Sequence, residues 1–94
     1  MRTIRFTSRF KMDFSRVQRG LSPEQLRAQL QPVVDMLLAD TVLPIKNRDH
    51  ALRGEWAGFR DCHIRPDLVL IYRKFEPAFL ELSRLGSHNE LFKK

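Results

Sequence analysis

The apolar positions of the N-terminal half follow strand spacing first and helical spacing afterwards. The first seven residues alternate in polarity, with Ile4 and Phe6 on one side, and this alternation predicts a short strand. Phe10, Phe14 and Val17 then recur at intervals of four and three residues. Such intervals place side chains on one face of a helix, so a helix is expected to follow the strand.

A second helix is predicted by a complete set of start signals. Ser22 can cap the helix, Pro23 suits the first helical position, and Gln25 completes a capping box. The residues that follow form one apolar stripe at helical spacing: Leu26, Leu30, Val33, Val34, Leu37 and Leu38. Pro32 lies inside this stripe, which predicts a kink or break near Gln31.

In the C-terminal half the apolar period changes to two. Strands are predicted over residues 59–65, 67–74 and 79–85, while residues 41–56 have no clean period and are expected to form a loop. A second capping box starts at Ser87 and predicts a short terminal helix. This order predicts an α+β fold, a small antiparallel sheet with two N-terminal helices packed on one face and a short C-terminal helix.

The composition fits one domain over residues 1–94. The hydrophobic fraction of 43% is typical of a globular protein. No apolar run reaches the roughly 18 residues that a membrane span needs, and the basic N-terminus lacks the apolar segment of a signal peptide. Cys62 is the single cysteine, which excludes an intramolecular disulfide and fits a reducing, cytoplasmic location.

The charge balance points to anionic partners. Seventeen Lys and Arg residues face eleven Asp and Glu residues, which gives a formal net charge of +6. Arginine suits phosphate and carboxylate because its planar group donates two parallel hydrogen bonds. The charge therefore favours nucleic acid, an acidic protein or both, although a solvated basic surface would give the same balance.

All three histidines lie in the second half of the chain, at His50, His63 and His88. Strand alternation puts Asp61 and His63 on one face and Cys62 on the other. If Cys62 faces the helices, Asp61 and His63 face the open side of the sheet. Such a group can supply a general acid, a general base and a carboxylate that orients an imidazole, although any one of these histidines can also be a surface or structural residue.

The terminal helix adds an aromatic ring to these candidates. Phe92 follows His88 by four residues, so both lie on one face of the helix, and Arg84 precedes them on the same edge of the sheet. A base can stack on Phe92 while the imidazole approaches a phosphate; alternatively, Phe92 is a core residue that fixes the C-terminus. The histidines lack the paired spacing of a zinc site, so we expect neither a metal nor another cofactor.

Two segments of the second half carry a family resemblance. DHALRGEWAGFRDCHIRPDLVLIYR and LELSRLGSHNELF contain the elements D-H-x-L-x-G-x-W-x-G-x-R-D-x-H-I-x-P-D and R-x-G-[ST]-H, which are jointly specific. From Asp49 to Phe92 the chain resembles the YafQ-type toxins of the RelE/ParE superfamily. The first half matches this family in organisation only.

The resemblance implies a fold, an activity and partners. The family fold is a small twisted antiparallel sheet with two N-terminal helices on one face. Its members cut messenger RNA in the A site of the 70S ribosome, and a cognate antitoxin of the DinJ/RelB type neutralises them. The functional positions of the family fall on seven residues, of which four are catalytic (His50, His63, Asp67 and His88) and three support substrate binding (Asp61, Arg84 and Phe92).

The mechanism expected from this resemblance needs no metal. A base removes the proton of a ribose 2′-OH, which attacks the adjacent phosphate, and an acid protonates the leaving 5′-oxygen. His50 or His63 would act at one end and His88 at the other, Asp67 would orient an imidazole, and Arg84 would stabilise the charge on phosphorus.

Two other functions compete with this one. A ParE-like toxin would bind DNA gyrase without cutting RNA, and a plain RNA-binding module would bind RNA and leave it intact. Neither accounts for three histidines and Asp67 in register with a nuclease pattern.

Overall fold

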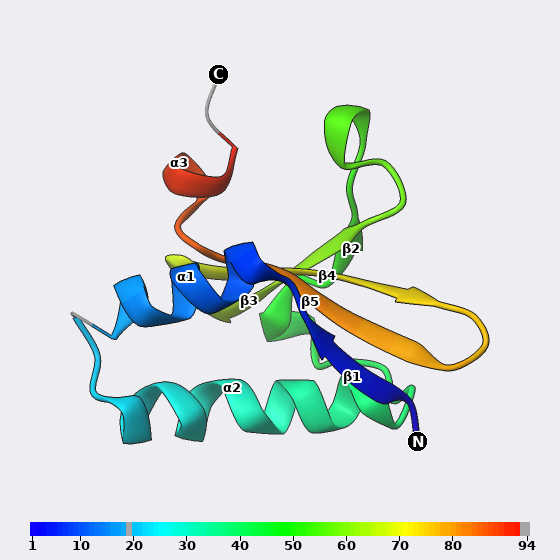
Figure 1. Cartoon of the computed structure of the whole chain (residues 1–94), viewed down its shortest axis with the longest axis horizontal. Helices are drawn as coiled ribbons and strands as arrows, with labels where there is room; N and C mark the ends of the chain where they lie inside the picture. Colours follow the sequence, from blue (N-terminus) through cyan, green and yellow to red (C-terminus); the bar gives the residue numbers. More distant parts are fainter. Residues whose placement is uncertain (19, 93–94) are drawn as a thin grey trace.

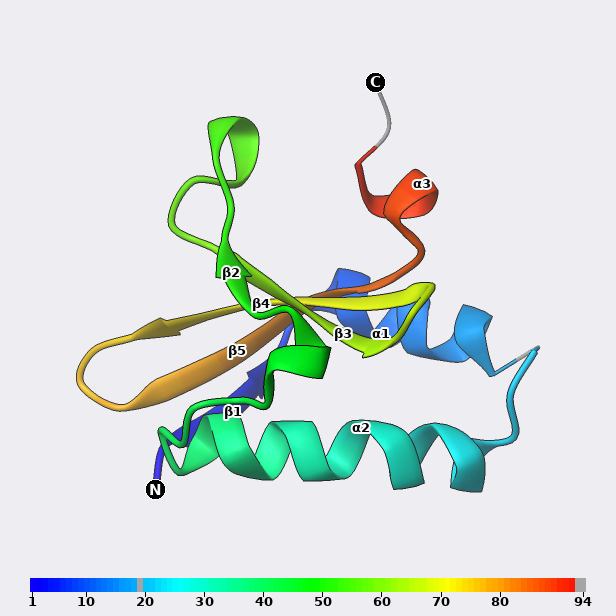
Figure 2. The same ribbon diagram turned by 180° about the vertical axis from the view of Figure 1, so that it is seen from behind.

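The computed structural model describes residues 1–18 and 20–92 and contains one sheet with helices on both sides of it (Figure 1). The regular elements, in chain order, are β1 (Thr3–Phe6), α1 (Ser8–Val17), α2 (Pro23–Leu38), β2 (His50–Ala51), β3 (Arg60–Arg65), β4 (Leu68–Phe75), β5 (Phe79–Gly86) and α3 (His88–Leu91). Helices α1 and α2 lie on one side of the sheet, and α3 rises on the other (Figures 1 and 2).

The sheet is mixed, which corrects one part of the expected fold. Its strand order is β1-β5-β4-β3-β2, and the pairs among β2 to β5 are antiparallel. Strand β1 runs parallel to β5, with Thr3 opposite Phe79 and Phe6 opposite Leu82. Alternation within a strand gives the period of its side chains but not its partner or direction, so the sequence could not reveal the parallel pair.

Both N-terminal helices begin after a capping residue, and the sequence predicted the one that starts the second helix. Thr7 caps α1, and Ser22 caps α2 with a complete capping box. The expected break near Pro32 is wrong, because α2 continues across it. Pro32 and Ala28, whose carbonyl loses its helical donor, both lie on the exposed side, where water can satisfy that carbonyl.

Strand β4 is the centre of the molecule and is buried on both faces, as its apolar sequence predicts. Leu70 and Tyr72 point toward the helices and join the main core, which also contains Leu82 of β5. Val69 and Ile71 point the other way and form a second, smaller apolar cluster beneath α3. The sheet therefore has one face covered by helices and one face that is covered only in part.

The region expected to be a loop contains short regular pieces. Residues Ile45–Asn47 and Gly54–Trp56 form single 3-10 turns, and β2 lies between them at the edge of the sheet. Asn47 donates a hydrogen bond from Nδ2 to the carbonyl of His63 at 2.8 Å, which ties this region to β3. A strand of two residues has no measurable period, so the sequence pattern could not predict it.

Candidate active site

Strand β3 divides its side chains between the two faces of the sheet. Cys62 and Ile64 pack in the core beneath the helices, which confirms the predicted orientation. Asp61 and His63 consequently point to the face away from α1 and α2, here called the histidine face. Asp61 was expected to face the open side of the sheet, but it is buried there, with only 1% of the residue exposed.

Strand β2 places His50 beside Asp61. The two are register partners, and His50 Nδ1 lies 3.1 Å from Asp61 Oδ1 and 2.8 Å from the carbonyl oxygen of Arg48. Nδ1 can carry one hydrogen, and the shorter contact assigns it to Arg48, because Asp61 Oδ1 accepts no hydrogen bond from the described residues. In the neutral ring Nε2 is then the basic nitrogen, on a side chain that is 53% exposed.

All three histidines influence the pKa of the buried Asp61 carboxylate. Burial raises the pKa of Asp61 above its usual value, while positive charge on His50, His88 and His63 acts in the opposite direction. The three imidazoles are therefore close enough to one carboxylate for its charge to stabilise an imidazolium among them.

Helix α3 brings a third histidine to the same face. Ser87 Oγ accepts a hydrogen bond from the Glu90 amide at 3.2 Å, and Glu90 Oε1 accepts one from the Ser87 amide at 2.8 Å, which confirms the predicted capping box. The ring centroids of His63 and His88 are 5.2 Å apart, and those of His88 and Phe92 are 5.5 Å apart. Three rings thus form a row in which two imidazoles and an aromatic surface are neighbours.

Phe92 combines the two roles considered for it. It packs against the second apolar cluster through Val69, Ile71 and Leu91, as a residue that fixes the C-terminus would. It nevertheless stays half-buried beside His88, so part of its ring can still meet a base.

Arg84 is held at the edge of the site by helix α1. It lies opposite Ile71 in the sheet, and its guanidinium donates to Asp13, from Nε to Oδ2 at 2.7 Å and from Nη2 to Oδ1 at 3.1 Å. This pair raises the pKa of Arg84 further, so the group is a permanent positive charge.

Asp67 is not placed against an imidazole. It lies in the exposed turn between β3 and β4 and lines a hollow that also contains Ser87 and Glu90. Within residues 1–18 and 20–92 its carboxylate makes no hydrogen bond or ion pair with a histidine. Its catalytic role stays a prediction.

Sequence reasoning missed two carboxylates that have several hydrogen-bond partners near the candidate site. Asp49 precedes His50, and its Oδ1 accepts hydrogen bonds from Tyr72 at 2.5 Å and from Arg60 at 3.3 Å, which anchors the start of β2. The second carboxylate is Asp13, which the sequence could have revealed. It lies on the apolar face of the first helix, where a buried acid needs hydrogen-bond partners.

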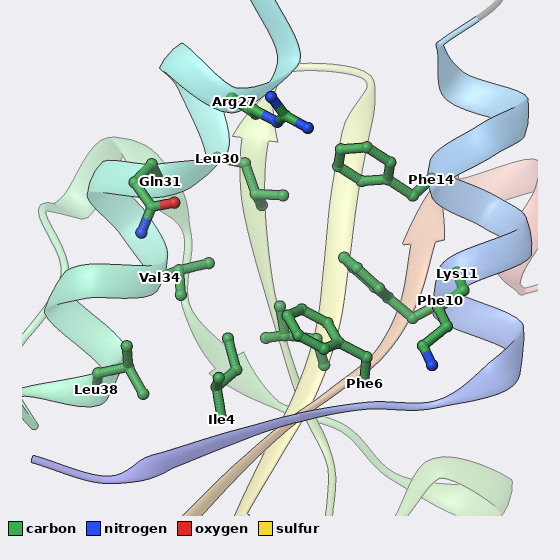
Figure 3. A pocket seen from close by; sticks show the side chains of 11 residues that line it. Ile4, Phe6, Phe10, Lys11, Phe14, Arg27, Leu30, Gln31, Val34 and Leu38 are labelled. Atoms are coloured by element: carbon green, nitrogen blue, oxygen red, sulfur yellow. The ribbon is translucent and has the colours of Figure 1, made fainter. Parts of the chain in front are cut away.

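A separate apolar groove lies on the helix side of the sheet, between α1, β1 and α2 (Figure 3). It has a volume of about 560 Å³, and 48% of Phe6 is exposed at its rim. It is lined on one side by Phe6, Phe10 and Phe14 and on the other by Leu30, Val34 and Leu38 (Figure 3). Its lining contains no histidine and no carboxylate, so the proton-transfer groups belong to the opposite face.

No group of three or more histidine, cysteine or acidic side chains in the described part of the chain is placed to hold a metal ion. Over the same residues, no helix is both long and apolar enough to cross a membrane.

Known proteins match two thirds or more of the chain. It is 40% identical over 65 residues to the mRNA interferase toxin YafQ of Escherichia coli K12, which covers 68% of this chain and 70% of that protein. It is 34% identical over 90 residues to the putative toxin YafQ of Haemophilus influenzae, covering 93% and 88% of the two chains.

Solved structures agree with these relatives. A copper-bound mutant toxin from Helicobacter pylori superposes with a TM-score of 0.88 at 36% identity, covering 98% of this chain and all of that one. YafQ in the E. coli DinJ–YafQ complex superposes with a TM-score of 0.83 at 30% identity, covering 98% and 99% of the two chains. The family model described as the YafQ toxin matches residues 2–93. The chain therefore belongs to the YafQ family of bacterial toxins of type II toxin–antitoxin systems.

Proposed function

We propose that this toxin is a ribosome-dependent endoribonuclease that cuts messenger RNA in the A site. The observation that carries the proposal is the row of His63, His88 and Phe92 on the histidine face, beside the His50–Asp61 pair. The relatives named mRNA interferase toxins support messenger RNA as the substrate. The net charge of +6 suits an RNA phosphate backbone.

The proposed reaction is a metal-independent transfer within one nucleotide. An imidazole takes the proton of the ribose 2′-OH, the O2′–P bond forms, and the P–O5′ bond breaks. A second, protonated imidazole gives its proton to the leaving 5′-oxygen, so the products are a 2′,3′-cyclic phosphate and a 5′-OH. Two imidazoles in opposite protonation states satisfy this balance of protons.

The proposed roles combine the family resemblance with the neighbours of each side chain. His50 or His63 acts at one end of the reacting phosphate and His88 at the other. Asp61 stabilises an imidazolium from its buried position. Arg84 stabilises the charge that develops on the phosphate oxygens, Phe92 holds a base, and Asp67 assists an imidazole when the site is filled.

The proposed partners are a translating 70S ribosome and a cognate antitoxin of the DinJ/RelB type. DinJ–YafQ complexes of E. coli support the antitoxin. Because the toxin acts on the protein-synthesis machinery, we expect its free form to stop translation and its antitoxin complex to be inactive.

Primer extension on a defined messenger tests the proposal. Purified toxin is added with and without translating ribosomes, and with and without its antitoxin, alongside His88→Ala. Asn89→Ala is the matched control, because Asn89 is the exposed neighbour of His88 on α3 and has no role in the proposed reaction. We expect cuts in codon register that need ribosomes, vanish in His88→Ala and persist in Asn89→Ala. An intact messenger in every condition would overturn the nuclease and direct the next experiment to gyrase supercoiling.

A further inference from the structure

Helix α1 carries a buried carboxylate that the proposed reaction does not use. Asp13 is 2% exposed on the side of α1 that packs on β5. It accepts four hydrogen bonds: two from Arg84 at 2.7 and 3.1 Å, one from the Leu85 amide at 3.0 Å and one from Arg16 at 2.8 Å. The carboxylate is thus bonded to β5 and to its own helix at once.

Arg16 continues these contacts to the turn that carries His88. Its Nη1 donates to Asp13, its Nη2 donates to the Leu85 carbonyl at 3.0 Å, and its Nε lies 3.1 Å from Glu90 Oε2. The other carboxylate oxygen of Glu90 closes the capping box with Ser87. We call Asp13, Arg16, Arg84 and Glu90 the α1–α3 ion network.

Gly86 makes room for this network. A Cβ at this position would lie 2.8 Å from Arg16 Nη2 and 2.9 Å from Glu90 Oε1. Both distances are shorter than real Cβ contacts, so a side chain here would have to shift the ends of Arg16 and Glu90. Glycine at this position therefore leaves space for the network, and its backbone conformation is not one that requires glycine.

The network requires the fold to bury an ionised carboxylate. Burial by itself would raise the pKa of Asp13, but hydrogen bonds from Arg84, Leu85 and Arg16 outweigh it and lower that pKa, so the carboxylate is ionised. An apolar residue of similar size often stabilises a core as well as a buried ion pair does. Stability alone therefore gives little reason to keep an acid at position 13. A better reason is that the carboxylate helps to fix the geometry of two neighbouring elements, the strand that carries Arg84 and the turn that carries His88.

We propose that Asp13 and Arg16 are positioning residues of the active site, Asp13 for the Arg84 guanidinium and Arg16, through Glu90, for the turn that carries His88. This inference rests on the proposed nuclease function. Asp13 occupies Nε and Nη2 of Arg84, while Nη1 forms no hydrogen bond with a described residue and is free to meet a phosphate oxygen. Asp13 thereby fixes which edge of the guanidinium faces the substrate.

Ribosome-dependent cleavage by Asp13→Asn tests the first half of the proposal. The amide keeps the size of the side chain but loses its charge and one acceptor oxygen, so Arg84 is held less firmly. We expect kcat to fall about 10- to 100-fold with KM changed by less than about twofold, because the contact acts on the transition state. Asp40→Asn is the matched control: Asp40 also pairs with two cations, Arg2 and Lys74, but far from the histidine face, and its activity should equal that of the unaltered toxin.

A double-mutant cycle distinguishes positioning from general weakening of the fold. If Asp13 acts through Arg84, then Asp13→Asn lowers kcat in the normal background and has no further effect in Arg84→Ala. Equal losses in both backgrounds, or full activity of Asp13→Asn, would overturn the role of Asp13. Failure of the unaltered toxin to cut would instead overturn the proposed function, so the two failures are distinguishable.

Arg16→Gln tests the second half and stands in if Asp13→Asn does not fold. Arg16 is partly exposed, so its replacement leaves less buried charge unpaired than a change at Asp13. We expect a lower kcat together with shifted imidazole ¹H–¹⁵N signals of His88, and unchanged signals of His50 as the internal reference. Unchanged His88 signals and full activity in a folded Arg16→Gln toxin would overturn the proposal.

Discussion

The two faces of the sheet are built from different kinds of side chain. On the helix side, α1 and α2 cover a continuous apolar core whose members are almost wholly buried. On the histidine face, the cluster is smaller and is surrounded by titratable groups and arginine. The contrast indicates that one face supplies most of the stability of the domain, and that the other uses this support to hold polar groups that cost stability.

The largest effect expected from this division concerns the histidine face. His63→Ala should lower the rate of messenger cleavage by roughly 10²- to 10⁴-fold, the usual contribution of a positioned acid or base. His63 is only partly buried, so the free energy of unfolding should change little. Single-turnover cleavage and urea unfolding of the same sample measure both. A large fall in the free energy of unfolding together with the loss of activity would contradict the proposal that the histidine face contributes little to stability.

The opposite result is expected on the helix side. Leu70 is fully buried in the main core, so Leu70→Ala should lower the free energy of unfolding by about 2–5 kcal/mol. Val42, which is 89% exposed, gives the control Val42→Ala with a change within about 0.5 kcal/mol. Urea unfolding at equal protein concentration checks both variants. If Leu70→Ala unfolds like Val42→Ala, the helix side is not the source of stability.

The smallest effect separates the two buried carboxylates by the sign of their pH dependence. The lowered pKa of Asp13 means that its stabilisation is present above its unfolded pKa of 3.8 and is lost as the pH falls through the lowered value. The raised pKa of Asp61 has the opposite consequence: its contribution is greatest below 3.8 and declines as the pH rises through the raised value.

Unfolding of Asp13→Asn and Asp61→Asn as a function of pH measures these slopes against the unaltered toxin. The free energy of unfolding of the toxin relative to Asp13→Asn should fall on acidification. Its free energy of unfolding relative to Asp61→Asn should fall as the pH rises. Slopes of the same sign would show that the two carboxylates do not differ in the way that their surroundings indicate.

Local sequence signals determined the individual elements well. Ser22 and Ser87 each form the predicted capping box, because a cap and its partner lie three residues apart. The alternation of β3 correctly assigned Cys62 to the core and His63 to the other face. The resemblance correctly identified the toxin family from the second half of the chain.

Only the tertiary structure decided which distant groups meet. Asp13 and Arg84 are 71 residues apart, and no spacing rule joins a helix to a strand over that separation. The same holds for the parallel pairing of β1 with β5. It also holds for His50, which lies in a two-residue strand whose position is set by pairing with Asp61 of β3. Sequence patterns report interactions within a few residues, whereas contacts between elements follow from how the whole chain buries its apolar faces.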